Sequence, residues 1–423
     1  MIPAIVLFVV SYVLILLFGD KKHWISLVSA ALFVLLGIFP IGEVVQTIDW
    51  NVLLMMLGMM GLVSLFIESK MPNLLADIIM EKVPNVQIAA VSLALFTGII
   101  SAFVDNVATV LMIAPVAIAV CKKLNTNPVP FIICIAVSSN LQGAATLVGD
   151  TTAIMLGSAL NMSFTDFFFY NGKPSMFFAV ELGAIVSSFI VAFMFRKNKE
   201  KIEKSKNRTL VTDYVPTILL LGNIAALIVA SFVPNKPDIT NGLISCTFFL
   251  IGLVRDCITG IGDRDLKDHL ASIDVKTLGF LTGLFLMIGG IEKAGVITAL
   301  SNVLAGLGNG NMFLMFTAIV VASMLISAFI DNIPYVATMI PVIAGIATQM
   351  GIDATPLYFG LLSGATLGGN MTPIGASANI TAIGILKKEG FEVKNSDFLK
   401  IGIPFTFASI VPAYIYIWVL YGI

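Results

Sequence analysis

The chain alternates long apolar runs with short polar breaks from one end to the other. Four of the longest runs lie at residues 2–18, 24–39, 176–195 and 403–421. A helix needs about 20 mostly apolar residues to cross the hydrocarbon core of a bilayer. Runs of this length and number predict an all-α polytopic membrane protein.

The composition agrees with this prediction. The chain has 423 residues, of which 58% are hydrophobic and only 12% are charged, whereas a soluble domain carries about 25% charged residues. The formal net charge is −1, so no strongly basic surface is available for nucleic acid. The expected partner is therefore the lipid bilayer, and no nucleic-acid partner is expected.

One apolar segment is duplicated with its polar centre intact. SAFVDNVATVLMIAPV at 101–116 recurs as SAFIDNIPYVATMIPV at 327–342. Each copy places an aspartate and an asparagine at membrane depth. A duplicated polar motif of this kind is typical of secondary transporters built from two repeats.

A second pair of segments follows the first. We align GAATLVGDTT at 143–152 with GATLGGNMT at 364–372. This alignment places Thr146 on Thr366, Gly149 on Gly369 and Asp150 on Asn370. Both segments are rich in glycine and threonine, which predicts an unwound stretch in the middle of a membrane helix.

Each half is predicted to contain three helices, a re-entrant helical hairpin, a broken helix and a final helix. The hairpin arms are expected at 86–104 and 107–121 in the first half. Irregular backbone at membrane depth is tolerated only where protein or water covers it. We divide the chain into first-half scaffold helices, first-half transport elements, a charged linker, second-half scaffold helices and second-half transport elements, at residues 1–85, 86–195, 196–214, 215–311 and 312–423.

The basic residues predict the orientation. Cytoplasmic loops carry an excess of lysine and arginine. If segment 196–208 is cytoplasmic and each half crosses the membrane five times, 21 of the 24 lysines and arginines fall on that side. The odd number of crossings inverts the second half relative to the first, and both termini are then external.

Polar side chains gather where the hairpin tips and broken helices are expected to meet. A charged side chain at the bilayer centre costs roughly 2.5–3.5 kcal/mol or more, so such groups are rarely incidental. Three of the candidates are carboxylates and none is lysine or arginine, which favours a cation or a proton over a bare anion. The candidate ion-binding residues are Asp105, Asn106, Thr146, Asp150, Thr152, Asp331, Asn332, Thr366, Asn370, Thr372, Ser377 and Asn379.

Three of these residues are assigned specific roles. Asp105 and Asp331 occupy equivalent repeat positions, so we expect them to share one site, where their carboxylates and the neighbouring asparagines are candidate ligands for Na⁺. Asp150 is aligned with Asn370, which cannot titrate. Because only one of the two aligned positions carries a carboxylate, Asp150 is our candidate for proton coupling.

Other acidic residues are interpreted differently. Asp49 and Asp274 stand at span ends, and we expect them to cap helices. Glu181 lies within an apolar helix, and its match in the second half is apolar. It either relays protons or pairs with a polar group across the bundle.

The cysteines and histidines form no pattern typical of a metal site. His23 and His269 are expected in short loops. The sequence has no HExxH, GxSxG or nucleotide-binding loop, so we predict neither a resident cofactor nor enzymatic activity, with Na⁺ or H⁺ as the coupling ion. The cysteines, none in a CxxC pair, are expected to be small hydrophobic residues of the helices: Cys121, Cys134, Cys246 and Cys257.

Four motifs carry a family resemblance: SAFVDNVATVLMIAPV, NLQGAATLVGDTTAIML at 140–156, SAFIDNIPYVATMIPV and GGNMTPIGASANITA at 368–382. With them the chain resembles the ion transporter superfamily, in the branch of arsenite permeases (ArsB), NhaD-type sodium–proton antiporters and the pigmentation P protein. The resemblance covers nearly the whole chain. It implies a scaffold domain, a mobile transport domain that carries the hairpins, an elevator motion and a homodimer.

The motifs differ in detail from those of two relatives. Sodium–dicarboxylate symporters carry Ser-Asn-Thr at the hairpin tips, where this chain has Asp105-Asn106-Val107 and Asp331-Asn332-Ile333. Arsenite permeases usually have GDPPN at the break, whereas GDTTA at 149–153 is closer to the NhaD-like pattern.

The leading interpretation is a secondary active transporter in a bacterial cell membrane, a proton-coupled antiporter of Na⁺ or a similar inorganic ion. An arsenite or oxyanion efflux permease and a sodium-coupled, citrate-like dicarboxylate symporter are the alternatives. A channel is disfavoured, because a channel needs a continuous pore rather than an occludable site.

Overall fold

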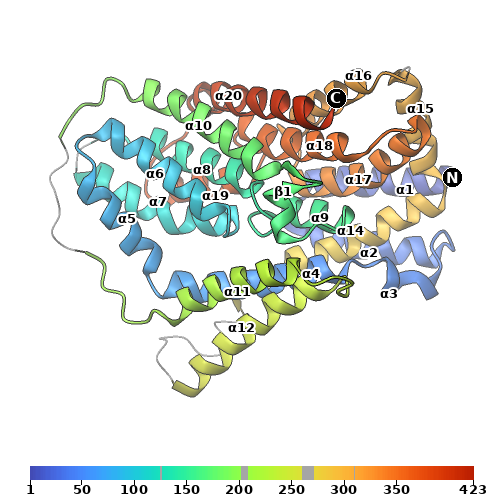
Figure 1. Ribbon diagram of the computed structural model, residues 1–423, viewed down its shortest axis with the longest axis horizontal. Coiled ribbons are helices and arrows are strands. Elements are labelled where there is room, and N and C mark those ends of the chain that lie inside the picture. The colour runs from blue at the N-terminus through green and yellow to red at the C-terminus, as the bar shows by residue number, and fades with distance from the viewer. Residues whose placement is uncertain (124–125, 202–207, 260–270, 309) are drawn as a thin grey trace.

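The computed structural model describes the whole chain except residues 124–125, 202–207, 260–270 and 309, and the side chain of residue 123. The described part is almost entirely helical (Figure 1). Six helices are long and apolar enough to cross a membrane, or up to eight if each of two bent helix pairs counts as one span, judged by length and composition in this part of the chain. His269 and residues 202–207 of the predicted linker lie outside the described residues.

The first half begins with helices that precede the hairpin and ends with a long helix after a small two-stranded sheet, in which β1 and β2 pair antiparallel. Its elements are α1 (Ile2–Leu17), η1 (Gly19–Lys21), α2 (Lys22–Leu35), η2 (Ile41–Glu43), α3 (Val44–Thr47), α4 (Trp50–Glu68), α5 (Met71–Lys82), α6 (Val86–Ser101), α7 (Asn106–Lys123), α8 (Val129–Gly143), α9 (Thr151–Ala159), η3 (Phe164–Phe167), β1 (Phe169–Tyr170), β2 (Lys173–Pro174) and α10 (Met176–Met194).

The second half repeats the order of the main helices. Its elements are α11 (Val215–Ser231), α12 (Thr240–Thr259), α14 (Val275–Lys293), α15 (Val296–Gly308), α16 (Met312–Ser327), α17 (Asn332–Met350), α18 (Thr355–Gly368), η4 (Gly369–Met371), α19 (Ser377–Lys388) and α20 (Asn395–Tyr421).

The helix packing follows the duplication. α4 packs on α12 from the other half, and α14 packs on α2 in the corresponding way, while α10 and α20 pack on each other. The close contacts are equivalent, because Gly58 lies against the backbone of Ser245 and Gly283 lies against the backbone of Ser26. The predicted series of helices, hairpin, broken helix and final helix is therefore present in both halves, with α5 and α15 as additional helices before the hairpins. The inversion of the second half stays a prediction.

Each predicted hairpin is a pair of helices joined by a short non-helical tip. The first tip lies between α6 and α7, and the second between α16 and α17. α6 ends at Ser101, three residues before the predicted end of its arm, because Asp105 starts a new helix by capping α7 with its carboxylate. In each half the first part of the broken helix, α8 or α18, packs against both arms of its own hairpin.

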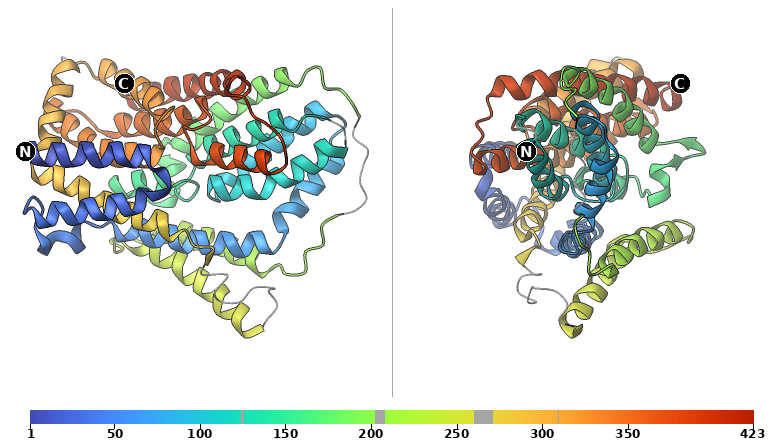
Figure 2. Two further views of the ribbon diagram at one scale, coloured as in Figure 1. Left: turned by 180° about the vertical axis from the view of Figure 1, so that it is seen from behind. Right: turned by 90° about the vertical axis from the view of Figure 1, so that its left-hand side faces the viewer.

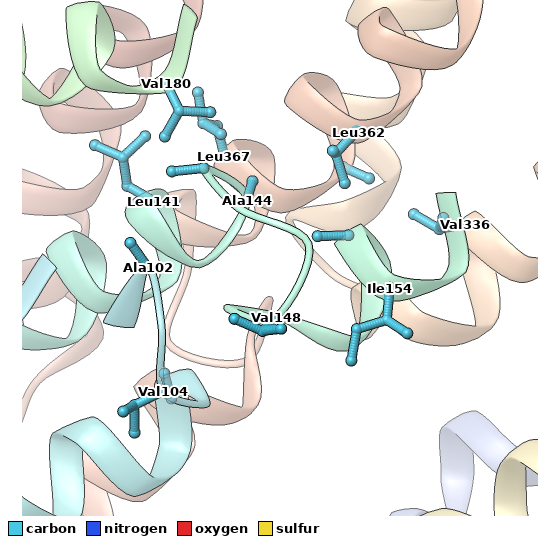
Figure 3. Packing of buried hydrophobic residues seen from close by; sticks show 14 of the residues in the cluster. Ala102, Val104, Leu141, Ala144, Val148, Ile154, Val180, Val336, Leu362 and Leu367 are labelled. Carbon is cyan, nitrogen blue, oxygen red and sulfur yellow. The ribbon is translucent and has the colours of Figure 1, made fainter. Parts of the chain in front are cut away.

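The second parts of the broken helices cross to the other half. α19 packs on α7 and α8, and α9 packs on α17 and α18. Figure 3 shows buried apolar side chains from both halves around the first break, among them Val148, Leu362 and Leu367. Protein therefore covers the irregular backbone, as membrane depth requires.

The two breaks correspond in a different register from the one we predicted. Asp150 precedes α9 with φ −145° and ψ 151°, and Ala376 precedes α19 with φ −144° and ψ 147°. The Thr146 hydroxyl donates to the carbonyl of Ala102, and the Thr372 hydroxyl donates to the carbonyl of Ala328. Asp150 thus corresponds to Ala376 and Thr146 to Thr372.

The predicted pairs Thr146 with Thr366, Gly149 with Gly369 and Asp150 with Asn370 are therefore wrong. The reason is a spacing that the alignment overlooked: GAATLVG at 143–149 and GNMTPIG at 369–375 share glycines six residues apart with a threonine midway. In each half, this spacing places the threonine and the second glycine against carbonyl groups of the hairpin tip.

The expectation that His23 lies in a loop is wrong, since His23 lies in the first turn of α2.

At the margin of the molecule, α11 and α12 lie together and α12 projects from the body (Figure 2). Their outer faces expose large apolar side chains, including Ile218, Leu221, Leu250 and Val254. Such a face is expected of helices in contact with lipid.

Candidate functional site

A cavity of about 720 Å³ lies where the two hairpin tips meet the ends of the broken helices. Both halves line it, and its wall also includes residues from the turn before α2 and from the start of α14. The candidate residues that line it are Asp105, Asn106, Asp150, Asp331, Asn332 and Ser377. The structure therefore brings half of the predicted ion-binding residues to one space.

The first hairpin tip is ordered by its own aspartate. The carboxylate of Asp105 accepts hydrogen bonds from the backbone N–H groups of Val107 and Ala108 at 2.9 and 3.1 Å. Both bonds go to Oδ2, so Oδ1 has no protein donor among the described hydrogen bonds and the carboxylate borders the cavity. Asp105 therefore caps α7 and also lines the cavity.

Asn140 connects the two halves beneath this tip. The amide of Asn106 donates to Oδ1 of Asn140 at 3.0 Å, and the Asn140 amide donates to the carbonyl of Thr366 at 2.7 Å and to Oδ1 of Asn370 at 3.0 Å. Asn140 is fully buried. We did not predict it as a site residue, although the polar run SSNLQG directly before the break is a signal that could have indicated it.

Asp150 lies at the N-terminus of α9 and is 6% exposed. The Thr152 hydroxyl donates to its Oδ2 at 3.0 Å, and the same hydroxyl lies 3.1 Å from that of Thr366. A helix N-terminus stabilises negative charge. Asp150 is therefore a buried carboxylate that borders the cavity, and its partner Thr152 contacts Thr366 of the second half.

The second hairpin tip contains an ion pair that the sequence did not reveal. Nζ of Lys22, the first residue of α2, lies 3.0 Å from Oδ2 of Asp331. Lys22 and Lys276 both line the cavity. The expectation of a site without lysine is therefore wrong, because it counted only the hairpins and broken helices and left out the helices packed beside them.

Six predicted ligands hold the framework instead of lining the cavity. Thr146 and Thr372 bond to tip carbonyls, Thr152 and Thr366 contact each other, and the Asn370 amide donates to the carbonyl of Val137 at 3.0 Å. The Asn379 amide donates to the carbonyls of Gly369 and Thr372, both at 3.0 Å. None of these six residues borders the cavity. Their hydrogen bonds fix the backbone of the two breaks.

Glu181 lies away from the cavity on α10. Nε2 of Gln142, on α8, lies 2.8 and 2.9 Å from its two carboxylate oxygens. The side chain of Gln142 lies against Gly98, where a Cβ would collide with it. Of the two interpretations offered for Glu181, this geometry supports pairing across the bundle.

The two predicted helix caps are confirmed. Oδ1 of Asp49 accepts from the N–H of Val52 at 3.0 Å, and Oδ1 of Asp274 accepts from the N–H of Thr277 at 3.1 Å. Asp274 also lines the cavity. The residues that the structure describes contain no group of three or more histidine, cysteine, aspartate or glutamate side chains arranged to hold a metal ion.

A methyl group at Gly149 should damage this site. Its carbon would lie 2.5 Å from the carbonyl oxygen of Gly143 and 2.8 Å from those of Ser101 and Ala102. Overpacking typically costs about 1–3 kcal/mol, and backbone atoms yield less readily than side chains. We therefore expect Gly149→Ala to lower the apparent Tm of the purified protein by several degrees and to reduce transport.

Gly384→Ala is the matched control, since a Cβ at Gly384 on α19 meets nothing within 4 Å. It should leave the Tm unchanged or slightly higher, because alanine favours helix. Equal Tm values for the two variants would contradict the close fit between tip and break.

Comparison with known proteins agrees with this architecture. The citrate transporter family model matches residues 12–364. An uncharacterised transporter of Mycobacterium tuberculosis is 31% identical over 99% of both chains, and a 46 kDa membrane protein of Mycobacterium leprae is 32% identical over 99% of this chain and 98% of its own. The human P protein is 27% identical over 91% of this chain and 55% of its own length.

Two solved structures share the fold. The YdaH transporter of Alcanivorax borkumensis superposes with a TM-score of 0.61 at 13% identity, covering 89% of this chain and 87% of its own. MtrF of Neisseria gonorrhoeae, from a class of antimetabolite efflux pumps, superposes with a TM-score of 0.58 at 14% identity, covering 97% of this chain and 84% of its own. The chain is therefore a membrane transporter that belongs to the citrate transporter family.

Proposed function

We propose that this protein is a secondary active transporter that exchanges protons for Na⁺ or a similar inorganic cation. The observation that carries the proposal is the convergence of Asp105, Asp150 and Asp331 on one cavity between the two hairpin tips. Carboxylate oxygens are ligands that hard cations prefer. Only Asp331 of the three is paired with a basic side chain in the described ion pairs.

The second break supports this choice with an unpaired oxygen. Oδ1 of Asn379 is buried and has no hydrogen-bond partner in the structure, while its amide holds two carbonyls. A buried carbonyl oxygen without a donor is costly unless another partner satisfies it. Asn379 does not line the cavity, so the partner would be a dehydrated cation held between the cavity wall and the second break.

Proton coupling is assigned to Asp150. The corresponding position in the second half is Ala376, so only one of the two breaks offers a carboxylate. A cation and a proton bound at neighbouring carboxylates oppose each other, because each lowers the affinity of the site for the other. Competition of this kind is the simplest physical basis for antiport.

We further propose that segment 196–208 and the turn before α2 face the cytoplasm, and that the second half is inverted. The cavity wall includes Asp20 from the turn before α2, His23 from the first turn of α2 and Ser272 from the connection before α14. We assign these segments to the same side, so the cavity would open toward the cytoplasm. Access from the other side would follow from an elevator movement of the hairpins and broken helices against the scaffold helices. We propose that the transporter works as a homodimer.

Transport of a carboxylate such as citrate is the second candidate. The family is described as citrate transporters, and α7, α9, α17 and α19 all begin at residues that line the cavity. Helix N-termini and lysine favour anions. The three carboxylates oppose a bare anion, which is why we place this function second.

Flux measurements on proteoliposomes test the proposal. We expect Na⁺ or Li⁺ to be accumulated when a pH gradient is imposed, with no accumulation when the gradient is collapsed by an ionophore. Citrate and arsenite should not be accumulated under either condition. Citrate uptake without cation exchange would establish the second candidate, and arsenite movement alone would establish oxyanion efflux.

A further inference from the structure

Lys22 is held between a hairpin tip and a neighbouring helix. Its Nζ lies 3.0 Å from Oδ2 of Asp331 and 5.0 Å from the ring centroid of Phe280, which is fully buried on α14. The side chains of Lys22 and Asp331 are 24% and 27% exposed, so the pair is partly buried and borders the cavity. The ring keeps the ammonium on the side of α2 and α14, while the carboxylate belongs to the tip.

In the part of the chain that the structure describes, the first hairpin tip has no equivalent of this ion pair. The helix contacts define the counterpart of Lys22, because Gly58 packs on Ser245 as Gly283 packs on Ser26. This register places Asn241 at the position of Lys22. Within the described residues Asp105 is bonded only to backbone N–H groups of its own helix. The two tips therefore have the same sequence motif and a different electrostatic state.

We propose that Lys22 is an internal counter-ion that competes with the transported cation for Asp331. When no cation is bound, the ammonium neutralises the tip, and when a cation enters the cavity, it displaces the ammonium from the carboxylate. Lys22 thus sets the affinity of the site without being a ligand of the cation. This inference rests on the proposed exchange of an inorganic cation.

The competition follows from charge and position. A carboxylate that is paired with an ammonium offers a weaker field to a second cation, and two cations close to one carboxylate repel each other. The lysine ammonium is a compact point charge on a flexible stem, so it can leave Asp331 and stay solvated in the cavity. The ion pair also joins residues 309 positions apart in the chain, so its release frees the tip from α2.

The first test measures the half-saturation concentration for Na⁺ in proteoliposomes. Lys22→Gln should lower it three- to tenfold, because the competitor is removed. Lys22→Arg keeps the charge and should stay within twofold of wild type. Lys21→Gln is the matched control: Lys21 is the exposed neighbour that does not line the cavity, and its replacement should change nothing.

A chemical rescue separates charge from packing. Lys22→Cys, made in a background without the four native cysteines, should show the low half-saturation concentration of Lys22→Gln. Modification with 2-aminoethyl methanethiosulfonate adds an ammonium and should restore the wild-type value. Modification with methyl methanethiosulfonate adds no charge and should leave the value low.

The double variant Lys22→Gln with Asp331→Asn distinguishes competition from a structural brace. Competition predicts a weak affinity for Na⁺, because the ligand is lost together with its competitor. Recovery of the wild-type value in the double variant would overturn the inference, as would an unchanged value in Lys22→Gln. Loss of citrate binding in Lys22→Gln would also overturn it, since Lys22 would then hold an anion.

The outcome separates this inference from the proposed function. If the wild-type protein moves neither Na⁺ nor Li⁺ against a proton gradient, the proposed function fails and the inference fails with it. If the wild-type protein exchanges cations and the Lys22 variants match Lys21→Gln, only the inference fails.

Discussion

Asp105→Asn should abolish cation transport, with a rate at least about 100-fold below wild type, while the protein still assembles. Asp105 is the tip carboxylate that borders the cavity without a basic partner among the described ion pairs, so its charge is available to a cation. Asparagine caps helices nearly as well as aspartate, so the start of α7 should be preserved. Asp105→Ala removes the cap too, which typically costs about 1 kcal/mol.

Flux in proteoliposomes measures cation transport, and the elution profile of the purified protein measures assembly. Asp49→Asn is the control, because Asp49 caps α4 in the same way and does not line the cavity. It should keep most of its flux. Wild-type flux from Asp105→Asn would mean that Asp105 is only a cap.

Asp150→Asn should uncouple transport from the proton gradient. The two side chains have nearly the same shape, and the Thr152 hydroxyl can still donate to an amide oxygen at that position. The variant has no titratable group at residue 150, and the second half has none at the corresponding residue, Ala376. We therefore expect Na⁺-for-Na⁺ exchange to continue while accumulation driven by a pH gradient falls to background.

Tracer exchange at equal pH and accumulation under a pH gradient measure the two activities on the same vesicles. Asp150→Ala, which copies the second half, should behave in the same way if charge is decisive. If Asp150→Asn accumulates Na⁺ at the wild-type rate, Asp150 is not the coupling residue.

Much of the fold follows from the sequence because the duplication is visible in it. SAFVDN and SAFIDN mark both hairpin tips, and the glycine-rich stretches mark both breaks. The register of the breaks was missed because GATLGG resembles GAATLVG more closely than GNMTPIG does. The backbone instead selects Gly149 and Gly375, the positions where a side chain would meet the tip carbonyls.

The part of the site that could not be predicted comes from tertiary packing. Lys22 follows an apolar run, so the local sequence predicts an exposed cation in a loop. No neighbouring residue in the sequence indicates that it contacts Asp331. The pairing of α2 with α14 brings it to the cavity. Asn140 was missed for a similar reason, because its partners Thr366 and Asn370 lie in the other half.

The contacts that fix the register also limit how each hairpin moves. The Thr146 hydroxyl and the backbone at Gly149 lie against the carbonyls of the first tip, and Thr372 and Gly375 do the same at the second. A tip fastened in this way cannot swing open as a lid without breaking these contacts. In the proposed elevator movement, tip and break would therefore move together as one unit, and a bound ion would travel with its binding site.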